Sequence, residues 1–277
     1  TGGEISAAYG ITLLALIMLI YQPLGGLRSV AWTDVVQGLM LLVGIVVIFV
    51  ALEITYDGMT NLLGSLQESS PQLWAPPTGT EKIHWLSTLV LIFFSIAIYP
   101  HAVQRIYAAK NERTLRRTFQ VMIFMPLVTT LLMVLVGVVG AARFPGLDRN
   151  SSENITLLVL QDIATQIPSL AIILTIFVAA VLAAIMSTID SALLSISSMF
   201  TQDLYRRMRP ETSEARLTSL GKWFSWAVMG AMVVGAVNLP QTIWALIQIK
   251  LELLVQAAPA IFLGLHLTRL RGTPVFI

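Results

Sequence analysis

Residues 169–200 read SLAIILTIFVAAVLAAIMSTIDSALLSISSMF, and Asp190 is the only charged residue among them. An α-helix needs ~20 predominantly apolar residues to cross the hydrocarbon core of a bilayer, and this run is longer. The run is continuously apolar, whereas a strand of a membrane β-barrel alternates apolar and polar residues over ~10 positions. The segment therefore predicts a transmembrane α-helix.

The same pattern extends over the rest of the chain. Of its 277 residues, 56% are hydrophobic and 12% are charged, whereas soluble domains contain about 25% charged residues. Six further apolar segments lie at residues 7–21, 30–52, 86–103, 121–142, 223–239 and 242–265. We expect an all-α membrane protein with seven transmembrane helices, forming a single transmembrane domain over residues 1–277 in a lipid bilayer.

Composition and motifs exclude several classes of function. The chain has no cysteine, which excludes disulfides, cysteine-based zinc sites and thiol catalysis. Its net charge of +2 is too small for a nucleic-acid-binding surface, so no nucleic-acid partner is expected. Walker-type phosphate loops and the HExxH and GxSxG motifs of hydrolases do not occur in the sequence. An enzyme is therefore not expected.

The connections between the apolar segments alternate in charge. Basic residues follow the first, third, fifth and seventh segments, at Arg28, Arg105, Lys110, Arg113, Arg116, Arg117, Arg206, Arg207, Arg209, Arg216, Lys222, Arg269 and Arg271. Residues 57–82 and 143–166 carry mainly acidic and turn-forming residues. By the positive-inside rule, the basic connections face the cytoplasm. This predicts a multi-pass protein of the plasma (inner) membrane with the Thr1 end outside and the Ile277 end in the cytoplasm.

Polar residues form a stripe on the segment at residues 169–200. They are Ser187, Asp190, Ser191, Ser195 and Ser198, and their spacing places them on one face of a helix. Hydroxyl, carbonyl and carboxylate oxygens suit a hard monovalent cation such as Na⁺, whereas a divalent ion usually takes more carboxylates. Alternatively, the hydroxyls bond to carbonyls one turn earlier or join two helices.

Other polar residues in the apolar segments leave alternatives open. Asp34 and Gln37 share a helix face, which suits cation coordination, although Asp34 is also a favourable residue near a helix start. Lys250 and Glu252 leave their helix on nearly opposite sides, so either a solute or another helix is their partner. Pro100 is expected to break or kink its helix, and freed carbonyls there either line a cavity or belong to an ordinary kink.

Three stretches of the chain combine into a specific pattern. They are residues 21–30 (YQPLGGLRSV) with Trp32, Thr33, Asp34 and Gln37; Pro100 and His101 with residues 104–105 and 108–110; and residues 183–191 (AAIMSTIDS) continuing to residues 197–198 and 203–205. Together they resemble the sodium:solute symporter family, a group of sodium-coupled carriers of proline, pantothenate, sugars and sialic acid. One departure is Gln22, where the family usually has a small residue.

The resemblance implies a fold and a set of sodium ligands. The fold is a leucine-transporter-type bundle of two inverted repeats, in which the seven segments correspond to core helices 4 to 10. Because residue 1 is Thr, we expect a piece of a longer polypeptide, with core helices 1 to 3 upstream of it. The implied main sodium site takes the Ala184 carbonyl and the Ser187 and Thr188 hydroxyls. A second sodium, present in some members, takes the positions of Asp34, Ser187, Asp190 and Ser191.

The resemblance also implies a solute site at the bilayer midplane. Its candidates here are Ile96, Tyr99, Trp244 and Gln248. Proline-carrying members have aromatic residues where this chain has Ile92 and Ile96, which argues against proline itself. The predicted function is sodium-coupled symport, by alternating access, of a small organic solute such as an amino acid or a carboxylate. The alternatives are the membrane input domain of a sensor histidine kinase and a purely structural membrane subunit.

Overall fold

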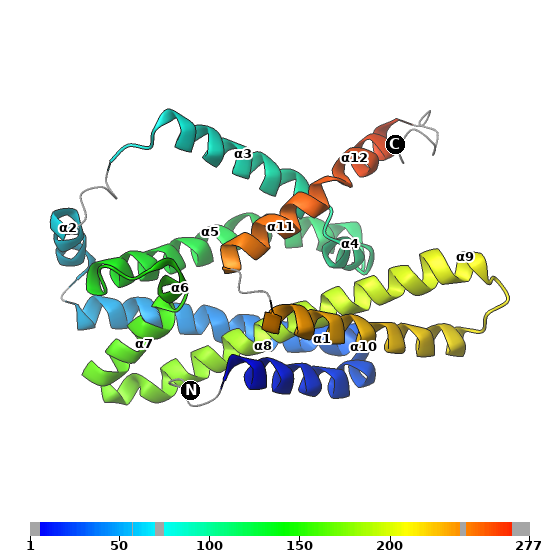
Figure 1. The fold of residues 1–277 in the computed structure, drawn as a ribbon, viewed down its shortest axis with the longest axis horizontal. Helices are drawn as coiled ribbons and strands as arrows, with labels where there is room; N and C mark the ends of the chain where they lie inside the picture. Colours follow the sequence, from blue (N-terminus) through cyan, green and yellow to red (C-terminus); the bar gives the residue numbers. More distant parts are fainter. Residues whose placement is uncertain (1–5, 57, 70–74, 239–241, 268–277) are drawn as a thin grey trace. The chain divides into compact units, whose positions relative to one another are not determined.

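The computed structural model describes residues 6–56, 58–69, 75–238 and 242–267, and within these ranges the chain is helical and contains no β-strand. The helices follow one another along the chain as shown in Figure 1. They are α1 (Ala7–Thr55), α2 (Met59–Ser69), α3 (Gly79–Ile96), α4 (Pro100–Tyr107), α5 (Glu112–Arg143), α6 (Arg149–Ser152), α7 (Ile155–Gln166), the 3₁₀-helix η2 (Pro168–Leu170), α8 (Ala171–Ser198), the π-helix η3 (Met199–Tyr205), α9 (Arg206–Met208), α10 (Glu214–Asn238), α11 (Ile243–Val255) and α12 (Ala258–His266).

The helices agree with an all-α membrane protein. In the described ranges, five helical stretches are long and apolar enough to cross a bilayer: Ala31–Thr55, Glu112–Arg143, Pro168–Met208, Glu214–Asn238 and Ile243–Gly264. A sixth span is formed if α3 and α4, which meet at a bend of 44°, are taken together. The segment expected at residues 7–21 forms a shorter apolar helix, Ala8–Ile20. The all-α membrane class is therefore confirmed, with five or six candidate spans in the described ranges where seven were expected.

Two connections contain helices that the sequence analysis did not anticipate. The connection at residues 57–82 begins with α2, and the connection at residues 143–166 contains α7. Gly146 makes the turn before α7 with a φ of 80°, a backbone conformation that glycine adopts without steric cost. Val159 and Ile163 of α7 are fully buried. The residues before α8 are therefore part of the packed structure and not only a surface loop.

The chain divides into two compact units. The first consists of Thr1–Trp74 and Arg113–Pro240, and the second consists of Ala75–Glu112 and Gln241–Ile277.

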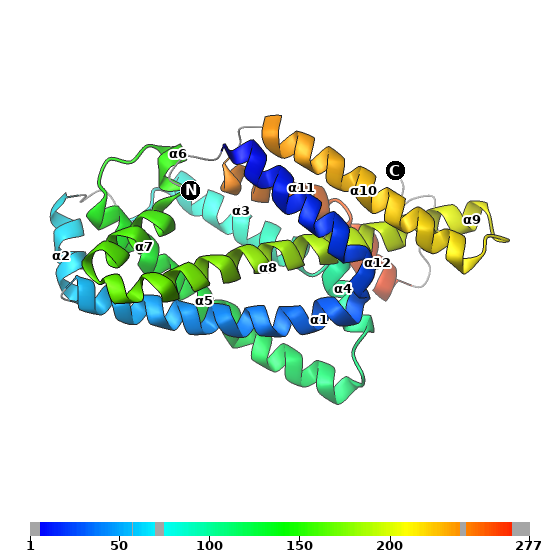
Figure 2. The ribbon, with the colours of Figure 1, turned by 90° about the horizontal axis from the view of Figure 1, so that it is seen from below.

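Helix α8 is the centre of the first unit, and α1 and α10 pack along it (Figure 2). Ile48 of α1 and Phe177 of α8 belong to one buried cluster, together with residues of α5 and α7. Gly44 allows this packing, because a side-chain carbon at that position would collide with the Phe177 ring. Because lipid tails are as apolar as phenylalanine, this contact stabilises the α1–α8 interface through close van der Waals packing.

Helix α1 contacts α8 twice, which requires its axis to turn back. Ala15 lies in a buried cluster against which Met186 packs, and Asp34 contacts the next residue, Ser187. A straight helix would separate Ala15 from Asp34 by roughly 30 Å at its rise of 1.5 Å per residue. The two halves of α1 therefore return to the same level of α8, as Figure 2 shows. This matches the two separate apolar segments expected at residues 7–21 and 30–52.

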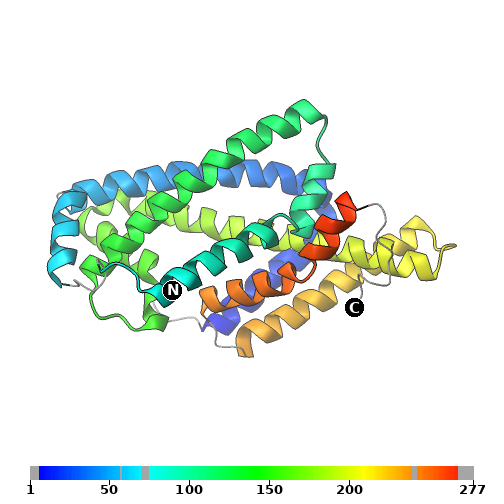
Figure 3. The ribbon, with the colours of Figure 1, turned by 90° about the horizontal axis from the view of Figure 1, so that it is seen from above.

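The second unit pairs α3 with α11, which lie side by side in Figure 3. Thr78 and Glu81 form a capping box at the start of α3. Near the other end of this helix, the hydroxyl of the fully buried Ser95 donates a hydrogen bond of 2.8 Å to the Leu251 carbonyl of α11. Pro100 then starts α4 at its first position, where its missing N–H removes no hydrogen bond. The helix break expected at Pro100 is present.

Candidate functional site

The polar stripe of α8 faces the interior of the first unit. Ser187, Asp190, Ser191 and Ser195 are all buried, and Asp190 is only 2% exposed. Ser198, the last member of the predicted stripe, is half-buried. Burying polar groups in an apolar environment costs free energy unless they have partners. The stripe is therefore directed toward neighbouring helices and not toward lipid.

Asp34 of α1 meets this stripe at its first serine. The Ser187 hydroxyl donates a hydrogen bond to the Asp34 carboxylate, across the α1–α8 interface. Gln37 lies one turn further along α1, and its side-chain oxygen is buried without a hydrogen-bond partner in the described ranges. The structure thus brings together Asp34 and Ser187, two of the residues chosen from the sequence, with an amide oxygen on the same helix face.

Thr188 and Ala184 form the second pair of predicted ligands. The Thr188 hydroxyl donates a hydrogen bond of 2.9 Å to the Ala184 carbonyl, one turn earlier in α8. This is the local bond that the sequence analysis kept open as an alternative. The bond uses the hydroxyl proton and one lone pair of the carbonyl, so both oxygens keep lone pairs for a cation. Thr188 is exposed in the described part of the chain, on a different side of α8 from Asp190.

The chemistry of these groups is that of a site for a hard cation. Helix α8 supplies hydroxyls, a carbonyl and a carboxylate, and the sequence has no lysine or arginine between Asn150 and Tyr205. Groups of three or more His, Cys, Asp or Glu that could hold a metal do not occur in the described residues. The oxygens are mostly neutral, as suits a monovalent ion better than a divalent one.

The solute-site candidates lie in the second unit. Tyr99 is the residue before α4, and its ring centroid lies 5.1 Å from that of His101. Ile96 ends α3 and is exposed, whereas Trp244 and Gln248 are one turn apart on α11. Among the described residues, no hydrogen bond or ring contact joins Tyr99 to these three side chains. The structure places the four candidates in one unit.

Lys250 is the neighbour of Tyr99 that the sequence did not identify. Its ammonium lies 5.3 Å from the centroid of the Tyr99 ring, a geometry in which the ring attracts the cation. Lys250 therefore turns toward the helix break at Pro100. Spacing along α11 showed that Lys250 and Glu252 diverge, but it contained no information on which side of another helix each would meet.

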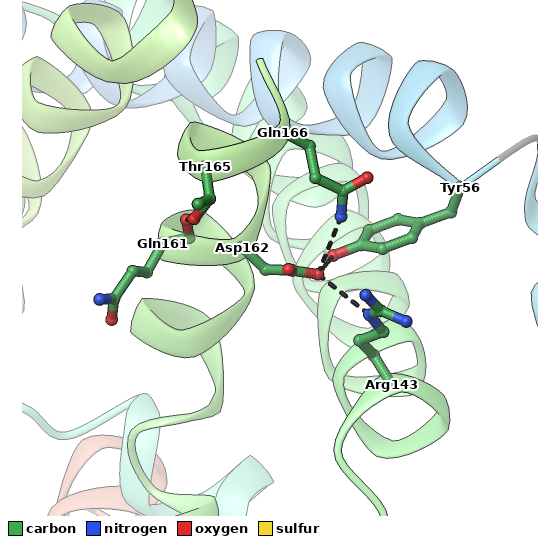
Figure 4. A network of polar contacts seen from close by, with 6 residues as sticks. All are labelled: Tyr56, Arg143, Gln161, Asp162, Thr165 and Gln166. Carbon is green, nitrogen blue, oxygen red and sulfur yellow. Dashed lines mark hydrogen bonds and ion pairs between the residues drawn. The ribbon is translucent and has the colours of Figure 1, made fainter. Parts of the chain in front are cut away.

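A second polar site, the Asp162 cluster, lies where α1, α5 and α7 end or pass close to one another (Figure 4). It consists of Tyr56, Arg143, Asp162 and Gln166. One carboxylate oxygen of Asp162 accepts three hydrogen bonds: from the Tyr56 hydroxyl at 2.6 Å, from Arg143 Nε at 3.1 Å and from Gln166 Nε2 at 3.2 Å. The Arg143 guanidinium also lies 5.9 Å from the centroid of the Tyr56 ring.

The protonation states of the Asp162 cluster follow from these contacts. Burial alone would raise the pKa of the Asp162 carboxyl, but the hydrogen bonds from Tyr56, Arg143 and Gln166 lower it below its usual value. Burial, the hydrogen bond to Asp162 and the charge of Asp162 raise the pKa of the Tyr56 hydroxyl, against a smaller opposite effect of Arg143. Tyr56 therefore remains a donor and Asp162 an ionised acceptor near neutral pH.

Sequence reasoning missed the Asp162 cluster, although one signal was present. Asp162 is the only charged residue of the apolar helix α7. A lone charge on an apolar helix needs a partner, because burying an unpaired charge costs free energy. Gln166 lies one turn further along α7, but Tyr56 and Arg143 come from the ends of two other helices, and no spacing rule relates these two to Asp162.

Comparisons with known proteins add an independent line of argument. A family model described as the sodium:solute symporter family matches residues 4–273. A sodium/pantothenate symporter of Haemophilus influenzae is 29% identical over 244 residues, covering 86% of this chain and 49% of that protein. The corresponding symporter of Escherichia coli is 29% identical over 240 residues, covering 84% of this chain and 48% of that protein.

A high-affinity proline transporter of Bacillus subtilis is 26% identical over 234 residues, covering 82% of this chain and 47% of the transporter. The chain thus spans about half the length of these curated relatives. No solved structure matches the chain.

Proposed function

Because the chain belongs to the sodium:solute symporter family, we propose that it forms part of a carrier that couples the movement of Na⁺ to uptake of a small organic solute. The three relatives named above are transporters and not enzymes, which favours a carrier over the sensor input domain. The observation that carries the proposal is the contact between Asp34 and Ser187, which places a carboxylate and a hydroxyl from two helices at one point inside the bundle.

The proposed main sodium site takes the Ala184 carbonyl and the hydroxyls of Ser187 and Thr188. The proposed second site takes Asp34, Ser187, Asp190 and Ser191. Ser187 belongs to both sets. When Na⁺ approaches, the Ser187 hydroxyl turns its proton away from Asp34 and presents a lone pair, so that the ion takes the place of the hydrogen bond. The supporting geometry is the burial of Ser187, Asp190 and Ser191 on the face of α8 that meets Asp34.

Sodium binding would change which conformation of the carrier predominates. An ion held by Asp34 of α1 and by the oxygens of α8 favours the state in which these helices are closest. A ligand shifts a conformational equilibrium only by the difference between its affinities for the two states. We propose that the sodium-bound state binds the solute more tightly, and that separation of α1 from α8 on the cytoplasmic side releases both.

The proposed solute is an amino acid, a carboxylate or a similar small organic molecule. Pantothenate and proline, which the names of the relatives give, are the first candidates to test. Tyr99, Ile96, Trp244 and Gln248 are the proposed contact residues. The supporting observation is the helix break after Ile96, because a broken transmembrane helix exposes backbone polar groups where they can bind a solute. The proposed orientation places the Thr1 end outside and the Ile277 end in the cytoplasm.

The test compares two threonines of the same helix. Thr188 and Thr175 are both exposed, and each donates a hydrogen bond to the carbonyl four residues earlier, at 2.9 and 2.8 Å. Only Thr188 is a proposed sodium ligand. In the protein that contains this chain, reconstituted in liposomes, Thr188→Val should raise the sodium concentration for half-maximal uptake about tenfold, corresponding to ~1.4 kcal/mol. Thr175→Val should leave it unchanged.

Equal effects of the two substitutions would show that the Thr188 hydroxyl is only a local backbone partner. The sodium site would then have to be sought elsewhere.

A further inference from the structure

A groove of about 280 Å³ lies between α10 and the adjoining ends of α8 and η3. Its lining from α8 and η3 includes Leu194, Ser197 and Gln202, and its lining from α10 includes Thr218, Lys222 and Trp226. All of these residues belong to the first unit. None of them is among the residues proposed above to bind sodium or solute.

The local backbone explains why the groove can form. The chain between Met199 and Tyr205 is a π-helix, which is wider than an α-helix and is common at functional sites. Helix α10 packs against this segment at Gly221, where a side-chain carbon would lie 3.5 Å from the Thr201 methyl, in ordinary van der Waals contact. The close approach at Gly221 leaves longer side chains on either side of it to line the groove.

The Lys222 ammonium and the Gln202 amide are two of the side-chain hydrogen-bond donors that line the groove. The hydroxyls of Ser197, Thr201 and Thr218 donate to backbone carbonyls of their own helical segments. The side-chain oxygen of Gln202 accepts a hydrogen bond of 3.0 Å from Arg206, which leaves its NH₂ group to donate. The Lys222 ammonium has no ion-pair or hydrogen-bond partner in the part of the chain that the structure describes. The Lys222 ammonium and the Gln202 NH₂ group both suit an anion.

The groove extends from the membrane surface into the apolar layer. Lys222 is the last charged residue of α10, because residues 223–238 carry no charge. Trp223 and Trp226 follow it directly, and both are exposed. Tryptophans after a terminal lysine mark the interface between a bilayer and water. Lys222 therefore lies at the depth of lipid head groups, and Trp226 with Leu194 lies at the start of the hydrocarbon.

The chain around the groove carries a net positive charge, because residues 203–222 contain five Arg or Lys and three Asp or Glu. Arg206 pairs with Glu214 at 3.0 Å, but Arg207, Arg209 and Arg216 form no ion pair within the described ranges. With Lys222, they make four unpaired cations in the connection that begins at the end of η3. Each such cation near an anionic membrane surface contributes about 1 kcal/mol of attraction.

We propose that this groove binds an anionic phospholipid from the adjacent leaflet. Lys222 and the Gln202 amide hold the phosphate, and an acyl chain lies along Trp226 and Leu194. A free phosphate ion would satisfy only the first half of this arrangement, because it leaves the apolar half of the groove exposed. The binding site is separate from the proposed transport function and does not depend on it.

The test counts lipids bound to the purified protein that contains this chain, by native mass spectrometry after extraction from vesicles of phosphatidylglycerol and phosphatidylcholine. The wild type should retain one phosphatidylglycerol molecule about tenfold more often than phosphatidylcholine. Lys222→Met should remove this preference, whereas Lys222→Arg should retain it. Lys110→Met serves as the control, because Lys110 is an exposed lysine of another basic connection.

Three results would overturn the proposal. Equal loss in Lys222→Met and Lys110→Met would show unspecific attraction by the whole basic surface. Full retention in Lys222→Met would remove the groove from lipid binding. Displacement of the lipid by millimolar inorganic phosphate would assign the groove to a free anion. Trp226→Ala, which leaves the charge intact, provides the second variant and should lower phosphatidylglycerol retention about fivefold, whereas unchanged retention would contradict the acyl-chain contact.

Discussion

Two carboxylates of the first unit lie between helices, and their surroundings differ. Asp162 accepts hydrogen bonds from Tyr56, Arg143 and Gln166, so a cationic side chain supplied by the protein itself balances its charge. Asp34 accepts from the Ser187 hydroxyl, on a helix that has no basic residue. A carboxylate paired with arginine has its charge balanced within the protein, and the contact of Asp34 with a hydroxyl of another helix places two oxygens where both can contact one cation. We therefore assign Asp162 to stability and propose that Asp34 binds an ion.

The largest effect is expected at Asp34, and it tests the difference between the two carboxylates. Asp34→Ala removes the only charged group that α1 contributes to the proposed second site, so the apparent sodium affinity should fall about a hundredfold, or ~2.7 kcal/mol. The thermal unfolding midpoint without sodium should fall less than in Asp162→Ala, because the Ser187 hydroxyl is the donor known to lose its acceptor. Sodium-dependent thermal shift of the purified protein measures both quantities. A large loss of stability with unchanged sodium affinity would make Asp34 structural, like Asp162.

The next largest effect is expected at Asp162, where stability should fall and sodium affinity should not change. Asp162→Ala leaves Arg143 and Tyr56 without their common acceptor, and the protein should lose about 2 kcal/mol of stability. The loss is moderate because the side chains of Arg143 and Asp162 are 50% and 20% exposed, and exposed ion pairs contribute little. The sodium affinity should stay the same. Glu211→Ala, at an exposed carboxylate between α9 and α10, is the control and should alter neither property; a fall in sodium affinity with Asp162→Ala would join the two sites.

The pH dependence of stability sharpens the assignment of Asp162. Its pKa in the folded protein lies below the usual value, so its contribution is complete above the ordinary aspartate pKa of about 4. That contribution is lost as the pH falls through the lower folded-state pKa. The difference in thermal midpoint between the wild type and Asp162→Asn should therefore be constant from pH 8 to about pH 5 and shrink below about pH 4. A difference that shrinks between pH 8 and pH 6 would contradict the ionised state.

The smallest effect is expected at Tyr56. Tyr56→Phe removes one of three donors to Asp162 but retains the ring near Arg143, so stability should fall by about 1 kcal/mol. Differential scanning calorimetry against Tyr107→Phe, at an exposed tyrosine of α4, isolates the hydroxyl contribution. If both variants melt alike, the short Tyr56–Asp162 hydrogen bond does not contribute to stability.

The membrane helices could be predicted from the sequence because their cause is local. A continuous apolar run needs no knowledge of the rest of the chain to become a transmembrane helix. Helix α7 spans only Ile155–Gln166, which is too short to cross a bilayer, so the criterion of a long apolar run assigns it to a connection. The return of α1 along α8 was expected only as two separate segments, since the partner of an apolar face is not encoded in its own spacing.

The candidate site was predictable in part for the same reason. Spacing along α8 placed Ser187, Asp190 and Ser191 on one face, and the structure shows that face buried. Spacing could not show that Asp34 would meet Ser187; only the resemblance to a family linked them. It also gave no indication of the contact between Lys250 and Tyr99, because cation–ring contacts between distant segments follow no sequence pattern.

The most direct test of the central claim is a double-mutant cycle on sodium affinity, with Asp34→Ala, Ser187→Ala and the two combined. If both residues hold the same ion, the combined variant should bind sodium little more weakly than Asp34→Ala alone, which corresponds to a coupling of about 1 kcal/mol or more. Losses that simply add would show that Asp34 and Ser187 do not share a sodium ion.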